Sequence, residues 1–215
     1  LLAGSTFVVS GYGWCGRGVA IRAKGHGAHV IICEVDPLRA LEAVMDGYQV
    51  MPMKQAIENA DMIFTSTGCR DVVGREHFLE LKDRALLANL GHFNVEINAQ
   101  ALNDLSIRKK KLKNDVEQFV LPNGNTIYLI AEGRLANLVT LGGHPPEIMD
   151  LSFSVQALAS ELLVKDRNKL ANQVIEVPEA VSRDVAALKL ETMGLHIDNL
   201  TSEQLQYIHS FQIGT

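Results

Sequence analysis

The sequence predicts an α/β protein built on a doubly wound parallel sheet, with an edge hairpin and additional C-terminal helices. Three observations predict this fold. Short apolar runs alternate with stretches of helical periodicity up to Gly91. A glycine-rich turn joins the first apolar run directly to the first helical stretch, as in a βαβ unit. After Gly91 the pattern changes to extended stretches around a turn, and then to longer helices.

The turn after the first apolar run contains Gly11, Gly13 and Gly16 in the spacing G-x-G-x-x-G. A second apolar run follows the helical stretch and ends in the acid Glu34. A lone glycine turn of this kind is often only structural. With a strand on either side and an acid at the end of the second strand, however, it is the dinucleotide-binding fingerprint of Rossmann folds. The context therefore predicts that the chain binds a dinucleotide.

Each of these residues has a physical role in that interpretation. Gly11 permits the tight turn, Gly13 lets the backbone approach a pyrophosphate, and Gly16 lets the helix pack close to the sheet. We expect the pyrophosphate at the free N–H groups of the helix start, where the helix dipole favours an anion. Glu34 is placed to bind the ribose hydroxyls, and its charge repels a 2′-phosphate. We therefore predict NAD rather than NADP.

The remaining elements follow from the same patterns. Strands are expected at residues 6–10, 28–34, 48–51, 61–66 and 84–90. Helices are expected between them at residues 14–25, 38–45, 52–59 and 77–81, the second beginning at Asp36-Pro37. A short helix at 97–103 comes next, followed by an extended stretch at 107–121, a turn at 122–125 and a strand at 126–131. The last three predict an antiparallel hairpin at the sheet edge.

The last part of the chain is predicted to be helical. Helices are expected at residues 147–163, 179–192 and 202–210, the last with Thr201 as its N-cap. We therefore expect a Rossmann-type NAD-binding domain at residues 1–145 and a C-terminal helical segment at residues 146–215. Residues 1–3 resemble the end of a helix capped by Gly4, and the chain does not begin with methionine. We thus expect a fragment whose upstream part is missing.

Composition narrows the class of partner. The hydrophobic content of 47% and the charged content of 21% are ordinary for a globular protein. The net charge of −5 argues against nucleic acid, and the basic run at residues 109–111 is expected to be a solvated strand or loop. No apolar run is long enough to cross a membrane. The cysteines lack paired or metal-ligand spacing and no secretory signal precedes them, so we expect reduced thiols, no metal and a cytoplasmic protein.

Polar residues gather where the predicted strands end, which is where open α/β sheets bind their ligands. They lie at residues 66–68, 89–93 and 137–144. His92 follows a buried strand and a glycine, so we expect it to project into the cleft. There it is either a general acid or base, or a residue that merely caps the strand end. The segment 142–146 joins two glycines to two prolines and suits either a simple loop or a hinge.

At these residues the sequence resembles the S-adenosyl-L-homocysteine hydrolases over essentially its whole length. A generic dehydrogenase would share only the glycine turn and the acid after the second strand, whereas further motifs match here in the same order. The matching stretches are GYGWCGRG at 11–18, EVDP at 34–37, TGC at 67–69, NLGHFNVE at 89–96, AEGRLANL at 131–138 and GHP at 143–145. The family's N-terminal substrate-binding part is absent.

The resemblance implies a reaction for the whole enzyme. A tightly held NAD oxidises the ribose 3′-hydroxyl of S-adenosylhomocysteine, and the ketone acidifies the 4′ C–H. A base removes that proton, homocysteine is eliminated, water adds, and the stored hydride returns to give adenosine. The cofactor is recycled within one turnover. The resemblance also implies a homotetramer and a place in the methyl cycle of one-carbon metabolism.

The resemblance further implies roles for individual residues. The turn from Gly13 to Gly16 would hold the pyrophosphate, and Thr67, Leu90 and Asn137 would line the nicotinamide side. All the cofactor contacts implied in this way are Gly11, Gly13, Trp14, Cys15, Gly16, Glu34, Arg39, Ser66, Thr67, Gly68, Leu90, Gly91, His92, Asn137 and His144.

The substrate contacts implied by the resemblance come from two regions. His92 would touch the substrate ribose or transfer a proton, and is the implied catalytic residue. His144 would lie near the substrate at the hinge between domains. Met149 and Phe153 would pack near its adenine.

Two departures from the family pattern affect these implications. Arg39 stands where many members carry an asparagine near the adenosine ribose, and its longer cationic side chain could weaken discrimination against a 2′-phosphate. Many members also end in a tail with a lysine and a tyrosine that reach the neighbouring subunit's cofactor. This chain ends at residues 211–215 without them, which puts contacts of that type in doubt.

The leading hypothesis is therefore the NAD-binding portion of an S-adenosylhomocysteine hydrolase, which binds NAD without turnover by itself. A hydrolase of S-inosylhomocysteine is a close variant, because the base-recognising part lies mostly upstream. An NAD-dependent 2-hydroxyacid dehydrogenase-like domain is an alternative from another class, although the Gly-His-Phe motif argues against it. A non-catalytic NAD-binding module is a third.

Overall fold

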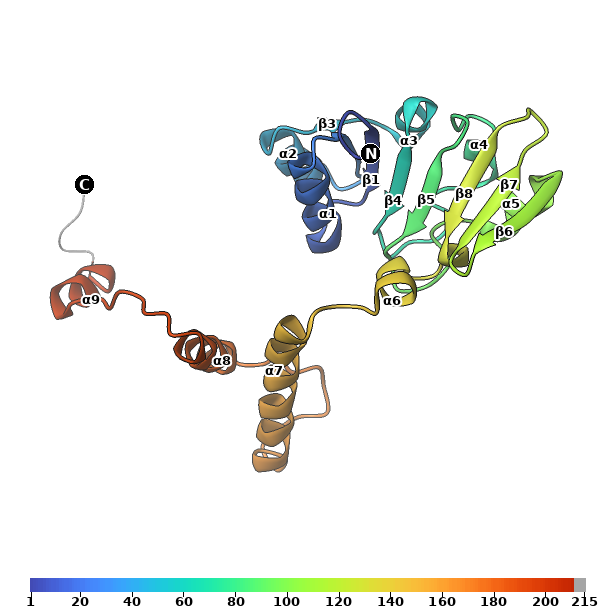
Figure 1. The fold of residues 1–215 in the computed structure, drawn as a ribbon. Helices are drawn as coiled ribbons and strands as arrows, with labels where there is room; N and C mark the ends of the chain where they lie inside the picture. The colour runs from blue at the N-terminus through green and yellow to red at the C-terminus, as the bar shows by residue number, and fades with distance from the viewer. Residues whose placement is uncertain (211–215) are drawn as a thin grey trace. The chain divides into compact units, whose positions relative to one another are not determined.

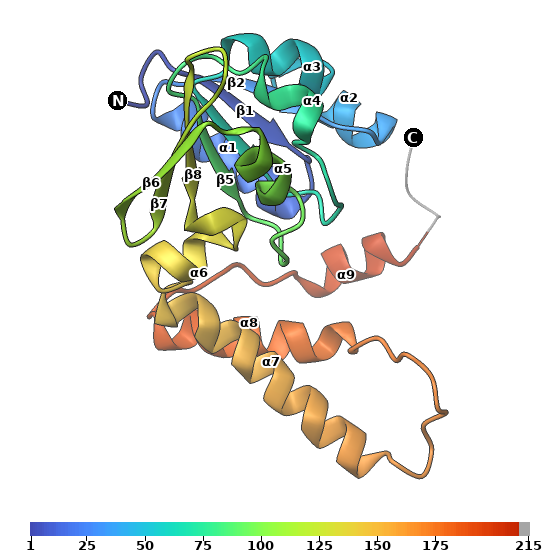
Figure 2. The ribbon, with the colours of Figure 1, turned by 90° about the vertical axis from the view of Figure 1, so that its right-hand side faces the viewer.

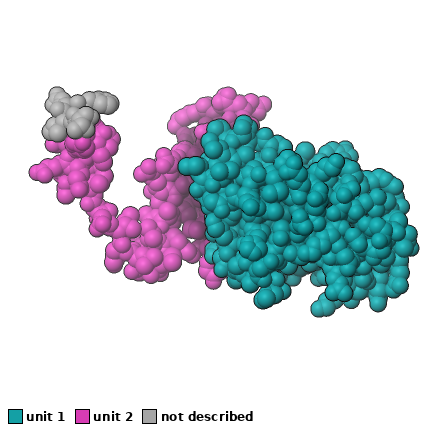
Figure 3. Space-filling view, turned by 90° about the horizontal axis from the view of Figure 1, so that it is seen from above, with its two compact units in different colours: residues 1–143 teal, residues 144–215 magenta. Residues whose placement is uncertain are grey.

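The computed structural model describes residues 1–210 and divides the chain into two compact units, Leu1–Gly143 and His144–Thr215 (Figure 3). The first unit is an α/β domain and the second is built of helices. The expectation about the chain end at residues 211–215 lies outside the described residues.

The first unit contains one eight-stranded sheet. In chain order its strands are β1 (Thr6–Ser10), β2 (His29–Cys33), β3 (Gln49–Val50), β4 (Met62–Thr65), β5 (Leu86–Asn89), β6 (Arg108–Lys113), β7 (Val116–Val120) and β8 (Thr126–Ile130). In space the order is β3-β2-β1-β4-β5-β8-β7-β6 (Figure 1). Neighbours from β3 to β8 are parallel, and the last two pairs are antiparallel.

Helices cover both faces of the sheet, so the predicted doubly wound α/β fold is confirmed (Figure 2). On one face lie α1 (Trp14–Gly25) and α2 (Pro37–Met45), and on the other α3 (Met53–Ala56), α4 (Arg75–Phe78) and α5 (Ala99–Leu105). Because successive strand residues point to opposite faces, Phe7 and Val9 pack with α1, whereas Val8 belongs to the other core. The central strands β1 and β2 are therefore buried almost throughout.

The helix starts follow their capping residues. The Asp36 side chain accepts a hydrogen bond from the Leu38 N–H at 2.9 Å, and Pro37 occupies the first position of α2 as predicted. The predicted helix at 97–103 begins two residues later as α5, because the Asn98 side chain caps it through the Ala101 N–H at 2.8 Å. The helix predicted at 77–81 lies earlier, as α4, because the Gly74 N–H donates to His77 Nδ1 at 3.0 Å.

The sheet edge differs from the prediction. The stretch 107–121 is not one extended segment but two antiparallel strands, β6 and β7, so the edge is a three-stranded meander rather than a hairpin. Alternate residues of β7 and β8 are buried, as in strands covered on one face only. The strand β6 is exposed along its length and carries the basic run, as expected for a solvated strand. A charged edge of this kind also resists pairing with other chains.

The helix end expected at residues 1–3 stays a prediction. Gly4 adopts a φ of +77° in a turn, the left-handed conformation that a glycine after a helix end commonly takes. The Gly4 N–H donates to the Gly27 carbonyl at 2.8 Å, and the Ser5 hydroxyl bonds the Leu2 carbonyl at 2.6 Å. The turn thus ties the chain to the loop before β2. The positive φ explains why a glycine stands at this position.

The second unit contains α7 (Pro146–Lys165), α8 (Glu179–Thr192) and α9 (Ser202–Ile208). An ion pair of 2.7 Å between Lys189 and Asp150 joins α8 to α7. The α9 helix begins as predicted at Thr201, whose hydroxyl accepts from the Gln204 N–H in a capping box. None of the residues of α7 is buried. Within residues 1–210, the helices fall short of the length and apolar character needed to span a membrane.

Candidate functional site

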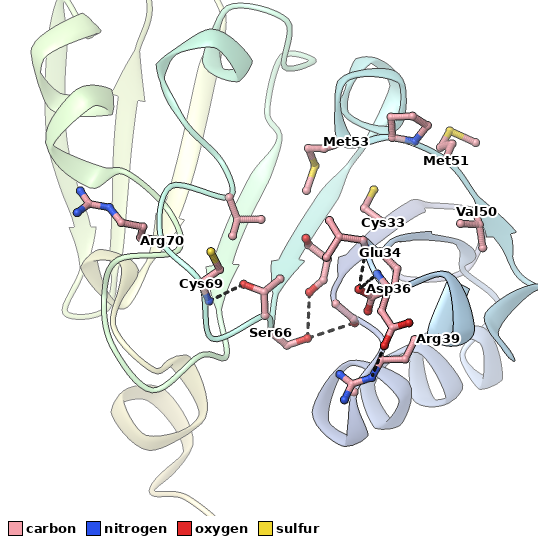
Figure 4. A pocket seen from close by; sticks show the side chains of 17 residues that line it. Cys33, Glu34, Asp36, Arg39, Val50, Met51, Met53, Ser66, Cys69 and Arg70 are labelled. Carbon is pink, nitrogen blue, oxygen red and sulfur yellow. Dashed lines mark hydrogen bonds and ion pairs between the residues drawn. The ribbon is translucent and has the colours of Figure 1, made fainter. Parts of the chain in front are cut away.

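A hollow of about 950 Å³ opens at the carboxyl ends of β1 to β4, the edge predicted to bind a ligand (Figure 4). The loop after β1 contributes Gly11 and Gly13, and the loop after β4 contributes Ser66 and Thr67. Residues after β2, including Glu34 and Arg39, complete its polar wall. The structure thus brings six of the predicted cofactor residues together around one hollow: Gly11, Gly13, Glu34, Arg39, Ser66 and Thr67.

The glycine turn is held in close contact with the start of α1. Gly11 has a φ of +92°, and a Cβ there would lie 2.7 Å from the Ser66 carbonyl oxygen. A Cβ at Gly16 would collide with the Gly11 carbonyl oxygen. Only glycine fits either position, because backbone atoms occupy the space of the side chain.

The start of α1 suits an anion. Its N-cap residue, Gly13, provides no side-chain cap, and the first turn contains no acid. The first N–H groups of a helix lack partners within the helix, and the dipole makes this end positive. A phosphate placed over Gly13 would meet these N–H groups with no Cβ in its way. The residues present therefore fit the pyrophosphate of a dinucleotide.

Glu34 joins the acid-bearing end of β2 to the glycine turn. Its carboxylate accepts from the Tyr12 N–H at 2.6 Å, the Val35 N–H at 2.7 Å and the Asp36 N–H at 3.1 Å. Burial alone would raise the pKa of Glu34, but these N–H groups and the nearby Arg39 guanidinium lower it below its ordinary value. The acid at the predicted ribose position is therefore charged at neutral pH.

A second carboxylate, Glu96, is almost fully buried and was missed as a site residue in the sequence. It accepts from the Thr67 N–H at 2.9 Å, the Thr67 hydroxyl at 2.8 Å and the Gly68 N–H at 2.8 Å. The loop after β4 is thereby tied to the loop after β5. The sequence contained one indication of this role, because Glu96 stands between the apolar residues Val95 and Ile97. An acid in such a buried setting is unusual unless hydrogen-bond donors compensate for the lost water.

Asn89 is a second buried polar residue that holds this edge in place. Its amide nitrogen donates to the carbonyl oxygens of Phe93 at 2.8 Å and Gly133 at 2.9 Å, and its oxygen accepts from the Gly91 N–H at 2.7 Å. The side chain therefore fixes the loop carrying Gly91 and His92, and ties it to the turn after β8. In the sequence, the indication of this role was an asparagine at the end of an apolar strand.

The turn after β8, η2 (Ala131–Gly133), is conformationally unusual. Ala131, Glu132 and Gly133 have φ values of +53°, +57° and +79°. Left-handed residues other than glycine cost about 1–2 kcal/mol each, so a run of them requires other contacts to hold it. The bond from Asn89 to the Gly133 carbonyl and a bond from the Ala131 N–H to the Asp115 carbonyl, 2.8 Å long, supply that hold.

His92 does not line the large hollow. Its exposed ring meets the Phe93 ring edge-on, with centroids 4.6 Å apart, and it borders a smaller hollow of about 300 Å³ with Leu135 and Leu138. This hollow lies beside α6 (Ala136–Leu141), which carries the half-buried Asn137.

The remaining predicted residues are placed as follows. Trp14 and Cys15 are exposed at the start of α1, while Gly68 is exposed and Leu90 half-buried in the loops held by Glu96 and Asn89. Three predicted residues belong to the second unit, namely His144, Met149 and Phe153. His144 and Phe153 are exposed, and Met149 is half-buried.

Two of the cysteines have raised pKa values. Burial and the nearby Glu96 raise the pKa of Cys15, and burial raises the pKa of Cys33 to about 12. Among residues 1–210, histidines, cysteines and acids form no cluster that could hold a metal ion.

Comparison with known proteins identifies the family. The family described as "S-adenosyl-L-homocysteine hydrolase, NAD binding domain" matches residues 1–143. The chain belongs to this family. NAD is therefore the cofactor of the first unit, and the match favours the hydrolase family over the 2-hydroxyacid dehydrogenase alternative.

Curated relatives extend the match to the whole chain. The adenosylhomocysteinase of Pyrobaculum aerophilum is 53% identical over 100% of this chain and 49% of its own length. The adenosylhomocysteinase of Aquifex aeolicus is 52% identical over 100% of this chain and 51% of its own length. The chain thus spans about half the length of the curated relatives it matches.

The geometry predicts that Glu96 stabilises the domain through its acceptor oxygens. In Glu96→Gln, one of the two oxygens becomes an amide that faces an N–H donor. We expect the free energy of unfolding, measured in urea, to fall by roughly 2 kcal/mol. The matched control is Glu80→Gln, whose carboxylate is exposed. Equal stability of the two variants would contradict the assigned role.

The lowered pKa of Glu34 predicts a pH-dependent contribution to stability. Because the folded pKa lies below the ordinary value of 4.5, the folded state binds fewer protons than the unfolded state as the pH falls. The stabilisation is complete above the ordinary value and is lost as the pH falls through the folded pKa. The stability difference between the wild type and Glu34→Gln should therefore shrink on acidification in urea unfolding series. A difference independent of pH would refute this prediction.

Proposed function

We propose that this chain is the NAD-binding part of an enzyme that hydrolyses S-adenosyl-L-homocysteine to adenosine and homocysteine, and that the 215-residue chain alone binds NAD without turnover. The observation that carries the proposal is the cradle at the start of α1, where a Cβ on Gly11 or Gly16 would meet backbone atoms. The family match over residues 1–143 supports the same conclusion. The relatives named adenosylhomocysteinase are about twice as long, and a substrate-binding part upstream would supply the remainder of the site.

The proposed roles at the adenosine end follow from the charged and polar groups of the hollow. The first turn of α1, including Trp14 and Cys15, holds the pyrophosphate through backbone N–H groups. Three backbone N–H groups use three of the roughly four acceptor sites of the Glu34 carboxylate, and the site left on the oxygen that bonds Tyr12 accepts a ribose hydroxyl. The carbonyl oxygen of Ser66 borders the hollow next to Gly11.

The proposed roles at the nicotinamide end rest on the two loops that Glu96 and Asn89 hold. Thr67 and Gly68 are fixed by the Glu96 carboxylate, and the loop of Leu90, Gly91 and His92 by the Asn89 amide. Rigid loops keep their backbone atoms in place for a ring of fixed shape. Asn137 belongs to the same end.

When bound, NAD supplies the reversible oxidation of the substrate's ribose hydroxyl. The chain's own contribution at that point is His92. Its imidazole is exposed beside the fixed loop, where it can contact the substrate ribose or move a proton. His144, Met149 and Phe153 contact the substrate from the second unit in this proposal.

The second unit supports a role in assembly. The α7 helix has no buried residue, yet Ile148, Phe153 and Leu163 are 54%, 57% and 50% exposed. Exposed apolar side chains of this size favour packing against another surface. We propose that residues 146–215 return to the upstream substrate domain and support a homotetramer. We further propose that the enzyme acts in the cytoplasm, in the methyl cycle, and that adenosyl and inosyl substrates are distinguished upstream.

The cradle predicts a sharp difference between two glycines of the same helix. In Gly16→Ala the new Cβ meets the Gly11 carbonyl, whereas in Gly18→Ala it meets nothing within 4 Å. We expect Gly16→Ala to weaken NAD binding by at least about tenfold in calorimetric titration, and Gly18→Ala to bind as the wild type does. Circular dichroism checks that both remain folded. Equal NAD affinity of the two variants would remove the basis of the proposed site.

If the active site needs an upstream part, mixing the chain with that part should restore activity. We expect the purified chain to bind NAD but to release no homocysteine from S-adenosylhomocysteine. Mixing it with the separately produced upstream segment of the same enzyme should restore hydrolysis, measured as free thiol. Turnover by the chain alone would overturn the inactivity, and NAD binding without any restored turnover would favour a non-catalytic NAD-binding module.

A further inference from the structure

The adenosine end of the hollow contains a cation as well as an acid. Arg39, in the first turn of α2, lies next to Asp36 at the border of the hollow (Figure 4). Its Nη1 lies 3.1 Å from the position that a Cβ on Gly13 would occupy. The guanidinium and Glu34 thus border the same part of the hollow, and Arg39 contributes to the lowered pKa of the Glu34 carboxyl.

The donors of Arg39 are largely free to bind a ligand. Its side chain is 55% exposed, and its ion pair with Asp36 is long, with Nε and Oδ2 3.8 Å apart. Another arginine bordering the hollow, Arg70, is instead engaged at 2.8 Å by Asp71. A guanidinium presents several donors in a plane, which match the oxygens of a phosphate monoester.

The acid at this end is partly satisfied by the protein itself. One oxygen of Glu34 accepts from Val35 and Asp36, and the other accepts from Tyr12. Its repulsion of a 2′-phosphate is therefore opposed by three backbone N–H groups and by the Arg39 cation. In Rossmann folds an acid at the end of the second strand selects the 2′-hydroxyl, and a nearby arginine accommodates the 2′-phosphate. Both elements are present in this chain.

We propose that Arg39 gives the adenosine end of this site affinity for a 2′-phosphate, so that the chain binds NADP as a second cofactor, more weakly than NAD. The inference rests on the proposed NAD site. Arg39 acts here as a specificity-determining residue, because it borders the same part of the hollow as Glu34, the acid expected to bind the ribose hydroxyls. Glu34 sets the preference for NAD, and Arg39 sets how far NADP is tolerated.

The test is a calorimetric titration of the 215-residue chain with NAD and NADP. A second pair of ligands, 5′-AMP and adenosine 2′,5′-bisphosphate, isolates the 2′-phosphate from the rest of the cofactor. We expect the wild type to bind NADP measurably and more weakly than NAD. Arg39→Gln should weaken NADP and the bisphosphate by about tenfold or more, as for loss of a charge-assisted hydrogen bond, and should change NAD and 5′-AMP by less than about threefold.

Matched variants separate this role from a general effect of charge. Arg84→Gln removes an arginine that also has a 3.8 Å ion pair, with Asp83, but borders no part of this hollow. It should leave all four affinities unchanged. Arg39→Lys keeps the charge and should retain part of the NADP affinity. Glu34→Gln should strengthen NADP relative to NAD, and adding Arg39→Gln to it should cancel that gain.

Three outcomes would overturn the inference. One is a wild type that binds NAD but shows no NADP binding at millimolar concentration. Another is an Arg39→Gln variant that loses NAD and NADP affinity equally, since the arginine would then act on the part common to both. If neither NAD nor NADP binds the folded wild type, the proposed NAD site fails, and this inference fails with it.

Discussion

The hydrogen bonds accepted by the buried carboxylate of Glu96 are the interaction on which the ligand-binding edge of the sheet depends. Each of its oxygens is bonded to the turn at Thr67 and Gly68, although Glu96 itself follows a different strand. A charge in this position is tolerated only because hydrogen-bond donors replace the water it has lost. The same carboxylate explains a neighbouring glycine, because a Cβ at Gly91 would collide with Glu96 Oε1.

Asn89 extends this arrangement from two loops to three. Its amide bonds the loop of Gly91 and Phe93 and also reaches the left-handed turn that ends at Gly133. Loops that hold one another in this way keep their shape without a ligand, so little ordering is required when one binds. Two buried polar side chains, Asn89 and Glu96, thus contribute to the rigidity of these loops.

The adenosine end works on a different physical basis. There the contacts come from backbone N–H groups at the start of α1 and from the opposed charges of Glu34 and Arg39. Backbone groups give a phosphate site that cannot be lost by a change of side chain, except where a Cβ would intrude, as at Gly16. Side-chain charges beside the ribose are free to vary, and they set which nucleotide is preferred.

Local signals predicted several elements of both units correctly. The bounds of α1 and α8 agree with the predicted residues 14–25 and 179–192, because periodicity and the neighbouring glycine or proline define both ends. The division of residues 107–121 into β6 and β7 was not predicted, since a strand of basic residues and a polar turn look alike without knowledge of their partner.

By itself, the sequence determined the doubly wound fold, the glycine turn and the acid at residue 34, since these depend on residues close together in the chain. The family match confirmed the cofactor, NAD. Only the tertiary structure decided which polar residues hold the site. Glu96 and Thr67 are far apart in sequence, as are Asn89 and Gly133, and they meet because parallel strands end at one edge. The position of the Arg39 guanidinium near Gly13 likewise follows from tertiary structure, because the pairing of β2 with β1 brings the start of α2 beside the glycine turn.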